Sequence, residues 1–107
     1  MRNVLRNIAN AISTYEAQID EDVQALIASS SEALYNNAKR DGYIGICIDV
    51  KRDVVARVVA SNFKQLGFSA TVKRDMHSSK QVLSISLNKN KLAQLIEDER
   101  DAYNNAG

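Results

Sequence analysis

The chain has 107 residues and a mass of 11.8 kDa, the size of one compact domain. Its hydrophobic content of 45% and charged content of 25% are those of an ordinary globular protein, and the absence of proline excludes a Pro-rich linker. One cysteine cannot form an intrachain disulfide, and Cys47 with His77 is too small a ligand set for a structural zinc site. No apolar run approaches the length of a membrane span or of a secretion signal, so we expect a cytoplasmic protein without a cofactor.

Charge is segregated along the chain although the formal net charge is only +1. Residues 1–38 carry a net charge of −3, residues 39–91 carry +7, and residues 92–107 carry −3. This asymmetry indicates either an anionic partner for the middle segment or acidic terminal helices that face a basic centre. The second interpretation is the simpler one, and we favour it.

The first forty residues are predicted to be helical, because apolar residues recur every three or four positions and no Pro or Gly interrupts them. These apolar residues are Val4, Ile8, Ile12, Tyr15, Ile19, Val23, Leu26 and Leu34. Two S-x-x-E sequences, at residues 13–16 and 29–32, are typical of helix starts and allow the segment to be split. One long helix and two or three shorter ones both fit. We favour a break near Ser13 and a second helix that ends near Arg40, before Gly42.

The middle of the chain changes to the two-residue period of β-strands. Alternating apolar and smaller or polar side chains, with many β-branched residues among them, predict three strands at residues 43–50, 68–73 and 82–87. The last two strands are close enough in sequence to form a hairpin around a loop at residues 75–80.

Two further helices are predicted around these strands. Residues 52–66 return to helical spacing and end at Gly67, a residue that suits the left-handed position after a helix. A C-terminal helix begins at Asn88 or Asn90, either of which can cap it. Its apolar side chains are Leu92, Leu95, Ile96 and Tyr103.

The order of these elements predicts an α+β protein that opens with an N-terminal helix or helical hairpin. The first two strands are joined through a helix, so we expect them to lie parallel by a right-handed crossover, while the last two pair antiparallel. The result is a small three-stranded mixed sheet with one helix on its apolar face. We expect a single domain made of a helical arm at residues 1–40, a β-α-β-β core at 41–88 and a C-terminal helix at 89–107.

The hydrophobic core is predicted from the inward positions of these elements: Ile44, Ile46, Ile48, Val55, Val58, Val59, Phe63, Phe68, Val72, Leu83 and Ile85. Three strands and one helix bury too little apolar surface alone, so the outer helices must cover more of it. The other face of the sheet carries small, mildly polar residues that either stay solvated or accept a helix at close range.

No combination of residues indicates catalysis, and we therefore expect no enzyme. Cys47 lies in the middle of a predicted strand and His77 in a loop about a strand length away, so they cannot form a nucleophile–base pair. The acidic runs at residues 20–22 and 97–99 point in different directions around their helices. No phosphate-binding loop, dinucleotide fingerprint, zinc-protease motif or calcium loop occurs.

The basic middle segment supports an anion-binding or partner-binding edge. If the first two strands are parallel, their C-terminal ends share one edge with the start of the third, which gathers Lys51, Arg52, Lys73, Arg74 and Lys80. Nearby Asp49, Asp53 and Asp75 neutralise part of this charge, and an ordinary salt-bridged rim is the alternative interpretation. Recognition of nucleic acid is further disfavoured because Tyr43 is the only ring on an outer position of the sheet.

The N-terminal apolar face is longer than the sheet it would cover. Thirty helical residues span roughly 45 Å, whereas short strands reach only about 20 Å. We therefore predict self-association, as a homodimer or higher homo-oligomer, through Ile12, Tyr15, Ile19, Val23 and Leu26. A break that folds the helix back onto the core is the alternative.

Residues 43–87 contain an Ile-rich strand, a helix that ends in QLGF, and the segments SATVKRD and VLSISLN. This stretch resembles the small β-α-β-β domains of tailed-phage proteins. The resemblance implies a phage-encoded protein in the host cytoplasm that binds other proteins, as an inhibitor of a host factor or host defence or as an accessory assembly part. A basic nucleic-acid-binding module is the first alternative, and a protein that sequesters a nucleotide or small molecule at an oligomer interface is the second.

Overall fold

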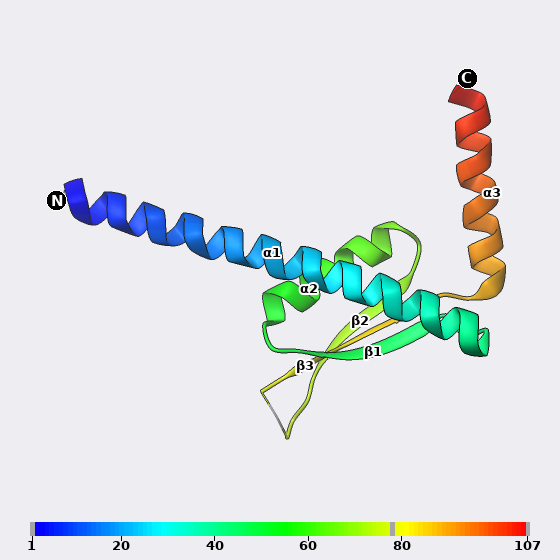
Figure 1. Ribbon diagram of the computed structural model, residues 1–107, viewed down its shortest axis with the longest axis horizontal. Helices are drawn as coiled ribbons and strands as arrows, with labels where there is room; N and C mark the ends of the chain where they lie inside the picture. The colour runs from blue at the N-terminus through cyan, green and yellow to red at the C-terminus, as the bar shows by residue number, and fades with distance from the viewer. Residues whose placement is uncertain (1, 78, 107) are drawn as a thin grey trace.

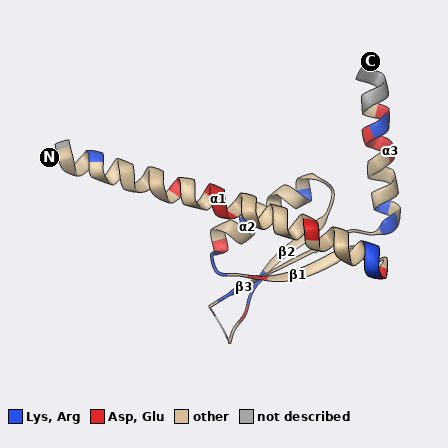
Figure 2. Ribbon diagram, in the orientation of Figure 1, with Lys and Arg blue, Asp and Glu red and all other residues tan. Residues whose placement is uncertain are grey.

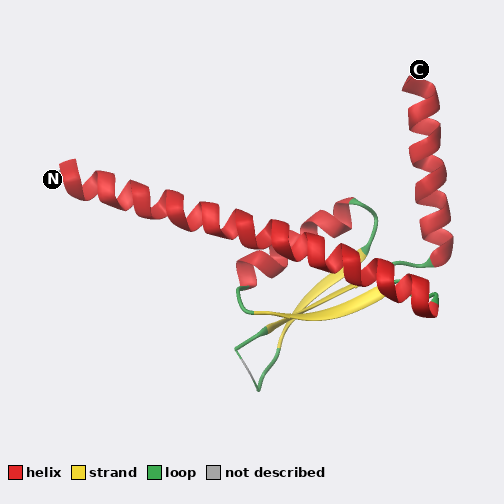
Figure 3. Cartoon of the chain, viewed as in Figure 1, coloured by secondary structure: helices red, strands yellow, loops and turns green. Residues whose placement is uncertain are grey.

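The computed structural model describes residues 2–77 and 79–106 of the chain, with side chains for residues 3–77 and 79–102. Its elements are α1 (Arg2–Asp41), β1 (Gly45–Val50), α2 (Asp53–Gln65), β2 (Ser69–Arg74), β3 (Gln81–Ser86) and α3 (Lys89–Ala106). Figures 1 and 3 show one small sheet with helices beside it and two helices that extend away from it. The α+β class and the predicted order of elements are confirmed.

Helix α1 is continuous over 40 residues, so the predicted break near Ser13 is wrong. A hydroxyl group at each of the two predicted helix starts bonds backwards within the helix instead. Thr14 Oγ1 donates to the carbonyl of Asn10 at 2.9 Å, and Ser29 Oγ donates to that of Leu26 at 3.2 Å. A side chain that satisfies itself on the preceding turn leaves the helical backbone intact. The predicted stop is confirmed, because Gly42 takes a φ of 69° just after the helix.

The sheet is antiparallel throughout, which corrects the predicted mixed sheet. Strand β3 lies in the centre, in the order β1-β3-β2, and pairs antiparallel with both neighbours. Strands β1 and β2 do run in the same direction, but β3 separates them. A central position lets β3, whose residues are all buried or half-buried, pair its backbone groups on both sides.

One face of the sheet and the two helices α1 and α2 enclose the hydrophobic core. The buried members of the predicted core are Val55, Val59, Phe63, Leu83 and Ile85, and the half-buried ones are Ile44, Ile46, Ile48, Phe68 and Val72. Val58 is 40% exposed and does not belong to the core. Ala56 and Ala60 are buried in its place, because small side chains allow α2 to approach the sheet closely.

Helix α1 completes this core with Ile19, Val23 and Leu34, which are all buried. Its C-terminal part is also tied to the first strand, since Asn37 Nδ2 donates to the carbonyl of Gly45 at 3.0 Å. We call the sheet, α2 and residues 19–41 of α1 the body. The expectation that an outer helix must cover more of the sheet is confirmed for α1.

The end of α2 forms the hydrogen-bonded cap that its sequence predicts. Gly67 has a φ of 104° and donates its N–H to the carbonyl of Lys64 at 3.0 Å. The N–H of Phe68 donates to the carbonyl of Phe63 at 3.0 Å, and the two rings meet edge to face with centroids 5.3 Å apart. This arrangement closes the helix with its last carbonyls paired and its apolar ends in contact.

Two helical segments extend beyond the body, which gives the chain extents of 58 × 46 × 19 Å (Figure 1). The first is residues 3–18 of α1, which we call the arm. The second is α3, which begins after Asn88, whose Oδ1 accepts from the Asn90 N–H at 2.7 Å. Leu95 of α3 lies against Gly67, whereas the predicted contribution of Tyr103 falls outside the described side chains.

No helix in residues 2–77 or 79–106 is long and apolar enough to cross a membrane.

Candidate functional site

The structure divides the predicted self-association face into two parts. Ile19 and Val23 are 9% and 5% exposed and lie in the core of the same chain, and Leu26 is half-buried against it. Ile12 and Tyr15 are 52% and 53% exposed. The assignment of Ile19 and Val23 to an intermolecular contact is therefore wrong, because α2 packs on α1 from this point onward.

The apolar surface of the arm consists of side chains that are each more than half exposed: Val4, Leu5, Ile8, Ile12 and Tyr15. We call it the arm stripe. The three- or four-residue spacing placed Val4 and Ile8 on this stripe, but the predicted break near Ser13 would have separated them, with Ile12, from Tyr15. Leu5, three residues before Ile8, also fits this spacing, although it was not among the predicted apolar residues.

The flanks of the arm stripe are almost free of charge. At 100° of rotation per residue, Ala11 and Gln18 fall on one flank and Ala9 on the other. Between residues 3 and 18 the charged residues are Arg6, on the side of the helix away from the stripe, and Glu16, beside it. Figure 2 shows an arm with few charged residues, in contrast to the acidic patches farther along α1. Such a surface suits contact with another apolar helix.

A second candidate site is the end of the sheet where β1 and β2 finish. Val50 and Arg74, the last residues of these strands, both lie opposite Gln81, the first residue of β3. The structure therefore brings the five predicted cations to one end, which we call the basic end: Lys51, Arg52, Lys73, Arg74 and Lys80. The antiparallel sheet preserves this gathering because β1 and β2 still share a direction (Figure 2).

Part of the charge at the basic end is paired. Arg52 Nη1 lies 3.9 Å from Asp22 Oδ2 of α1, and Asp53 accepts from Arg57 Nε at 2.6 Å. These side chains are all substantially exposed, so such pairs contribute little to folding stability. The ion pair to α1 was not foreseen from the sequence, since it depends on how α1 crosses the start of α2.

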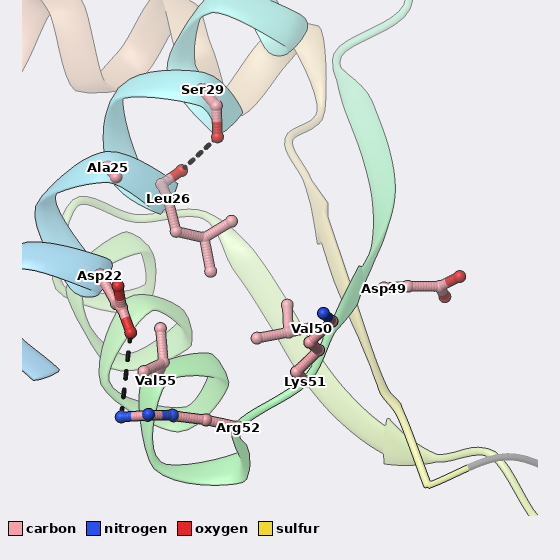
Figure 4. Close-up of a pocket in the computed structure, with 9 residues that line it drawn as sticks. All are labelled: Asp22, Ala25, Leu26, Ser29, Asp49, Val50, Lys51, Arg52 and Val55. Atoms are coloured by element: carbon pink, nitrogen blue, oxygen red, sulfur yellow. Dashed lines mark hydrogen bonds and ion pairs between the residues drawn. The ribbon is translucent and has the colours of Figure 1, made fainter.

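A groove of about 620 Å³ lies between α1 and the connection from β1 to α2. Figure 4 shows Leu26, Val50 and Val55 pointing into it, while Asp49 points away. The Arg52–Asp22 pair closes one side. The floor of the groove is apolar, and no two groups on it are suited to proton transfer.

The two residues considered for nucleophilic chemistry lie in different environments. Cys47 is exposed in β1, with Sγ 3.4 Å from Ser84 Oγ on the neighbouring strand. His77 lies in the loop after β2, where its backbone N–H donates to Asp75 Oδ1 at 3.0 Å. Among the described residues, no three His, Cys, Asp or Glu side chains gather as a metal site would require.

Comparison with protein-family models, with curated proteins and with solved structures found no match to this chain. The resemblance to tailed-phage domains therefore stays a prediction.

Proposed function

We propose that this chain is a small non-enzymatic protein that acts by binding other proteins through the arm, and that it self-associates. The observation that carries the proposal is the continuation of α1 past the body with the arm stripe uncovered. Contiguous apolar surface of this kind marks interaction sites on proteins in water.

The energetics of an isolated helix support the same proposal. The side chains of residues 3–18 are all exposed, so packing on the body stabilises the arm little, and helices of its length are marginal in water on their own. Binding that covers the arm stripe would bury apolar surface and stabilise the helix at the same time. The resemblance to phage domains adds a class of role, either inhibition of a host factor or defence system or a part in assembly.

Affinity purification from the source cell, with and without nuclease, tests this proposal. We expect a protein partner that survives nuclease treatment and is lost from an Ile8→Gln, Ile12→Gln variant. Leu66→Gln is the matched control, because Leu66 is apolar and exposed but lies at the end of α2. A partner retained by the arm variant would refute binding through the arm.

Binding of nucleic acid is the second candidate function, and the gathering of five cations at the basic end favours it. Contacts between these cations and phosphates would make affinity fall steeply with added salt. A Lys73→Glu, Arg74→Glu variant should then lose binding to a labelled oligonucleotide, measured by fluorescence anisotropy at several salt concentrations. Affinity that is unchanged by salt and by this variant would eliminate the basic end as a site.

A further inference from the structure

We infer that the arm stripe is covered by a second copy of the same chain, with the two arms side by side and antiparallel. This inference rests on the proposed function and names the partner of the arm. Two observations carry it. The first is the point along α1 where the stripe becomes buried against the body, and the second is the apolar, nearly uncharged surface of the arm.

The stripe is one continuous face of a single helix. It is exposed from Val4 to Tyr15 and buried from Ile19 onward, where α2 and the sheet cover the same face. A second helix that lies along the stripe can therefore run from the tip of the arm only as far as Ile19. Beyond that residue, the body occupies the space it would need.

Because a second helix can lie only along the arm, a symmetric pair of arms can adopt only one of the two possible orientations, parallel or antiparallel. In a parallel pair, both bodies would lie at the same end and on the facing sides of the two helices. Each body would then occupy the space required by residues 19–41 of the other α1. In an antiparallel pair, residue 3 of each arm lies beside residue 18 at the base of the other arm, and the two bodies lie at opposite ends. Only this second orientation covers both stripes without collision.

The chemistry of the arm is complementary to itself. An interface formed by the stripe places apolar side chains in its centre and the flanking Ala9, Ala11 and Gln18 at its margins. Arg6 points away from such an interface by its position on the helix, and Glu16 stays at the margin, so no charge is buried without a partner. A strongly charged partner would find no ions to pair with on this surface.

The exposed area of the stripe predicts the strength of the pair. Five apolar side chains that are each more than half exposed present on the order of 500 Å² per copy. Two copies then bury at most roughly 1,000 Å², which lies in the range of weak interfaces, below that of stable ones. We therefore expect a dimer with a Kd in the micromolar range.

Light scattering coupled to size exclusion, over a range of concentrations, gives the first test. The full chain should pass from 11.8 kDa to twice that mass as concentration rises. Ile8→Gln with Ile12→Gln should raise Kd about a hundredfold, whereas Leu66→Gln should leave it unchanged. Circular dichroism is expected to show that both variants stay folded, because all three residues are exposed.

Disulfide cross-linking gives the orientation. In a Cys47→Ser background, Ala11→Cys places the new thiol near the middle of the arm, where it meets its own copy in an antiparallel pair. Val4→Cys places it at the tip, where the two copies lie about 20 Å apart along the antiparallel pair. We expect Ala11→Cys to form covalent dimers about tenfold faster than Val4→Cys, because disulfides need Cα atoms within 7 Å. A mixture of Val4→Cys and Gln18→Cys chains should give a disulfide-linked heterodimer, because the antiparallel pair places residue 4 of one arm beside residue 18 of the other.

Two results would overturn the inference: a chain that stays monomeric at high micromolar concentration, or faster cross-linking of Val4→Cys than of Ala11→Cys. A monomeric chain that still captures a protein in an arm-dependent and nuclease-resistant way would refute the antiparallel dimer alone. Loss of that capture as well would refute the proposed function.

Discussion

Ser30 is fully buried on the core side of α1, and its hydroxyl oxygen has no hydrogen-bond partner among the described residues. The neighbouring Ser29 is exposed and donates to the carbonyl of Leu26. The two serines differ by one position in the sequence, but one faces the core and the other faces solvent. A buried hydroxyl that loses its bonds to water without replacement opposes folding.

Ser30→Ala should therefore raise the free energy of unfolding by about 1 kcal/mol, because it removes the unpaired hydroxyl and keeps a small side chain. Urea denaturation followed by circular dichroism measures the change. Ser29→Ala is the control, and its midpoint should shift little. A destabilised Ser30→Ala protein would show that the hydroxyl does find a partner.

Phe63 is buried where α2 meets the sheet, and its ring contacts that of Phe68. Phe63→Ala should lower the free energy of unfolding by about 3–5 kcal/mol through lost burial and a residual cavity. Phe63→Leu should cost less than half as much, because it refills most of the volume. Thermal unfolding checks both, and an unchanged melting temperature in Phe63→Ala would contradict this place in the core.

At the scale of elements, α1 is a single helix in two environments. Its first part is exposed to solvent, and its second part forms one side of the core. The change occurs between Tyr15 and Ile19, one turn apart on the same face of the helix. The helical backbone is the same on both sides of this boundary, so the packing of α2 and the sheet against α1 creates it.

Paired substitutions locate this boundary. Ile12→Glu with Tyr15→Glu should leave the unfolding temperature nearly unchanged, because both side chains are already exposed. Ile19→Glu with Val23→Glu should abolish cooperative unfolding, because two carboxylates would enter the core without partners. Calorimetry of the two variants at equal, low concentration makes the comparison. Similar behaviour of the two pairs would show that the arm and the body do not divide here.

The turn between α2 and β2 is also the place where α3 approaches the body. A Cβ added at Gly67 would lie 2.7 Å from Leu95 Cδ1, and the backbone there has a φ of 104°. At Gly42 the φ is 69°, and the nearest atom to an added Cβ is Lys89 Nζ at 3.6 Å. Both glycines have a positive φ, but an added Cβ has less space at Gly67 than at Gly42.

Gly67→Ala should therefore destabilise the protein by more than Gly42→Ala, which carries only the backbone cost of about 1 kcal/mol. In a Leu95→Ala background, the cost of Gly67→Ala should fall toward that of Gly42→Ala. Denaturant unfolding of this double-mutant cycle measures the coupling. Additive effects would mean that Leu95 does not rest on the turn.

At the scale of the whole molecule, stability is distributed unevenly. The sheet, α2 and the second part of α1 share one core, whereas the arm and most of α3 extend from it (Figure 1). Backbone amides in elements with few buried contacts open at low free energy cost. The molecule should therefore consist of a protected body with two weakly protected helices.

Hydrogen exchange should show slow exchange in β3 and α2 and fast exchange in the arm at low protein concentration. If the arms pair, protection within residues 3–18 should rise with concentration while that of β3 stays constant. Protection of the arm that is high and independent of concentration would contradict an arm free of the body.

The sequence by itself determined the type and order of the elements, because helical and strand periods are local properties. The cap at Gly67 and the stop at Gly42 were also readable, since they depend on a residue's own backbone freedom. The basic end followed from the shared direction of β1 and β2, although the strand between them was not foreseen.

The tertiary structure decided what depends on distant neighbours. It placed β3 in the centre, a choice among pairings that no strand's own pattern specifies. It also kept α1 whole, because hydroxyls that can start a helix can equally bond to the preceding turn. Above all, it divided one uniform apolar stripe between Tyr15 and Ile19. The residues on the two sides are alike, and it is the packing of α2 and the sheet that buries one set and leaves the other exposed.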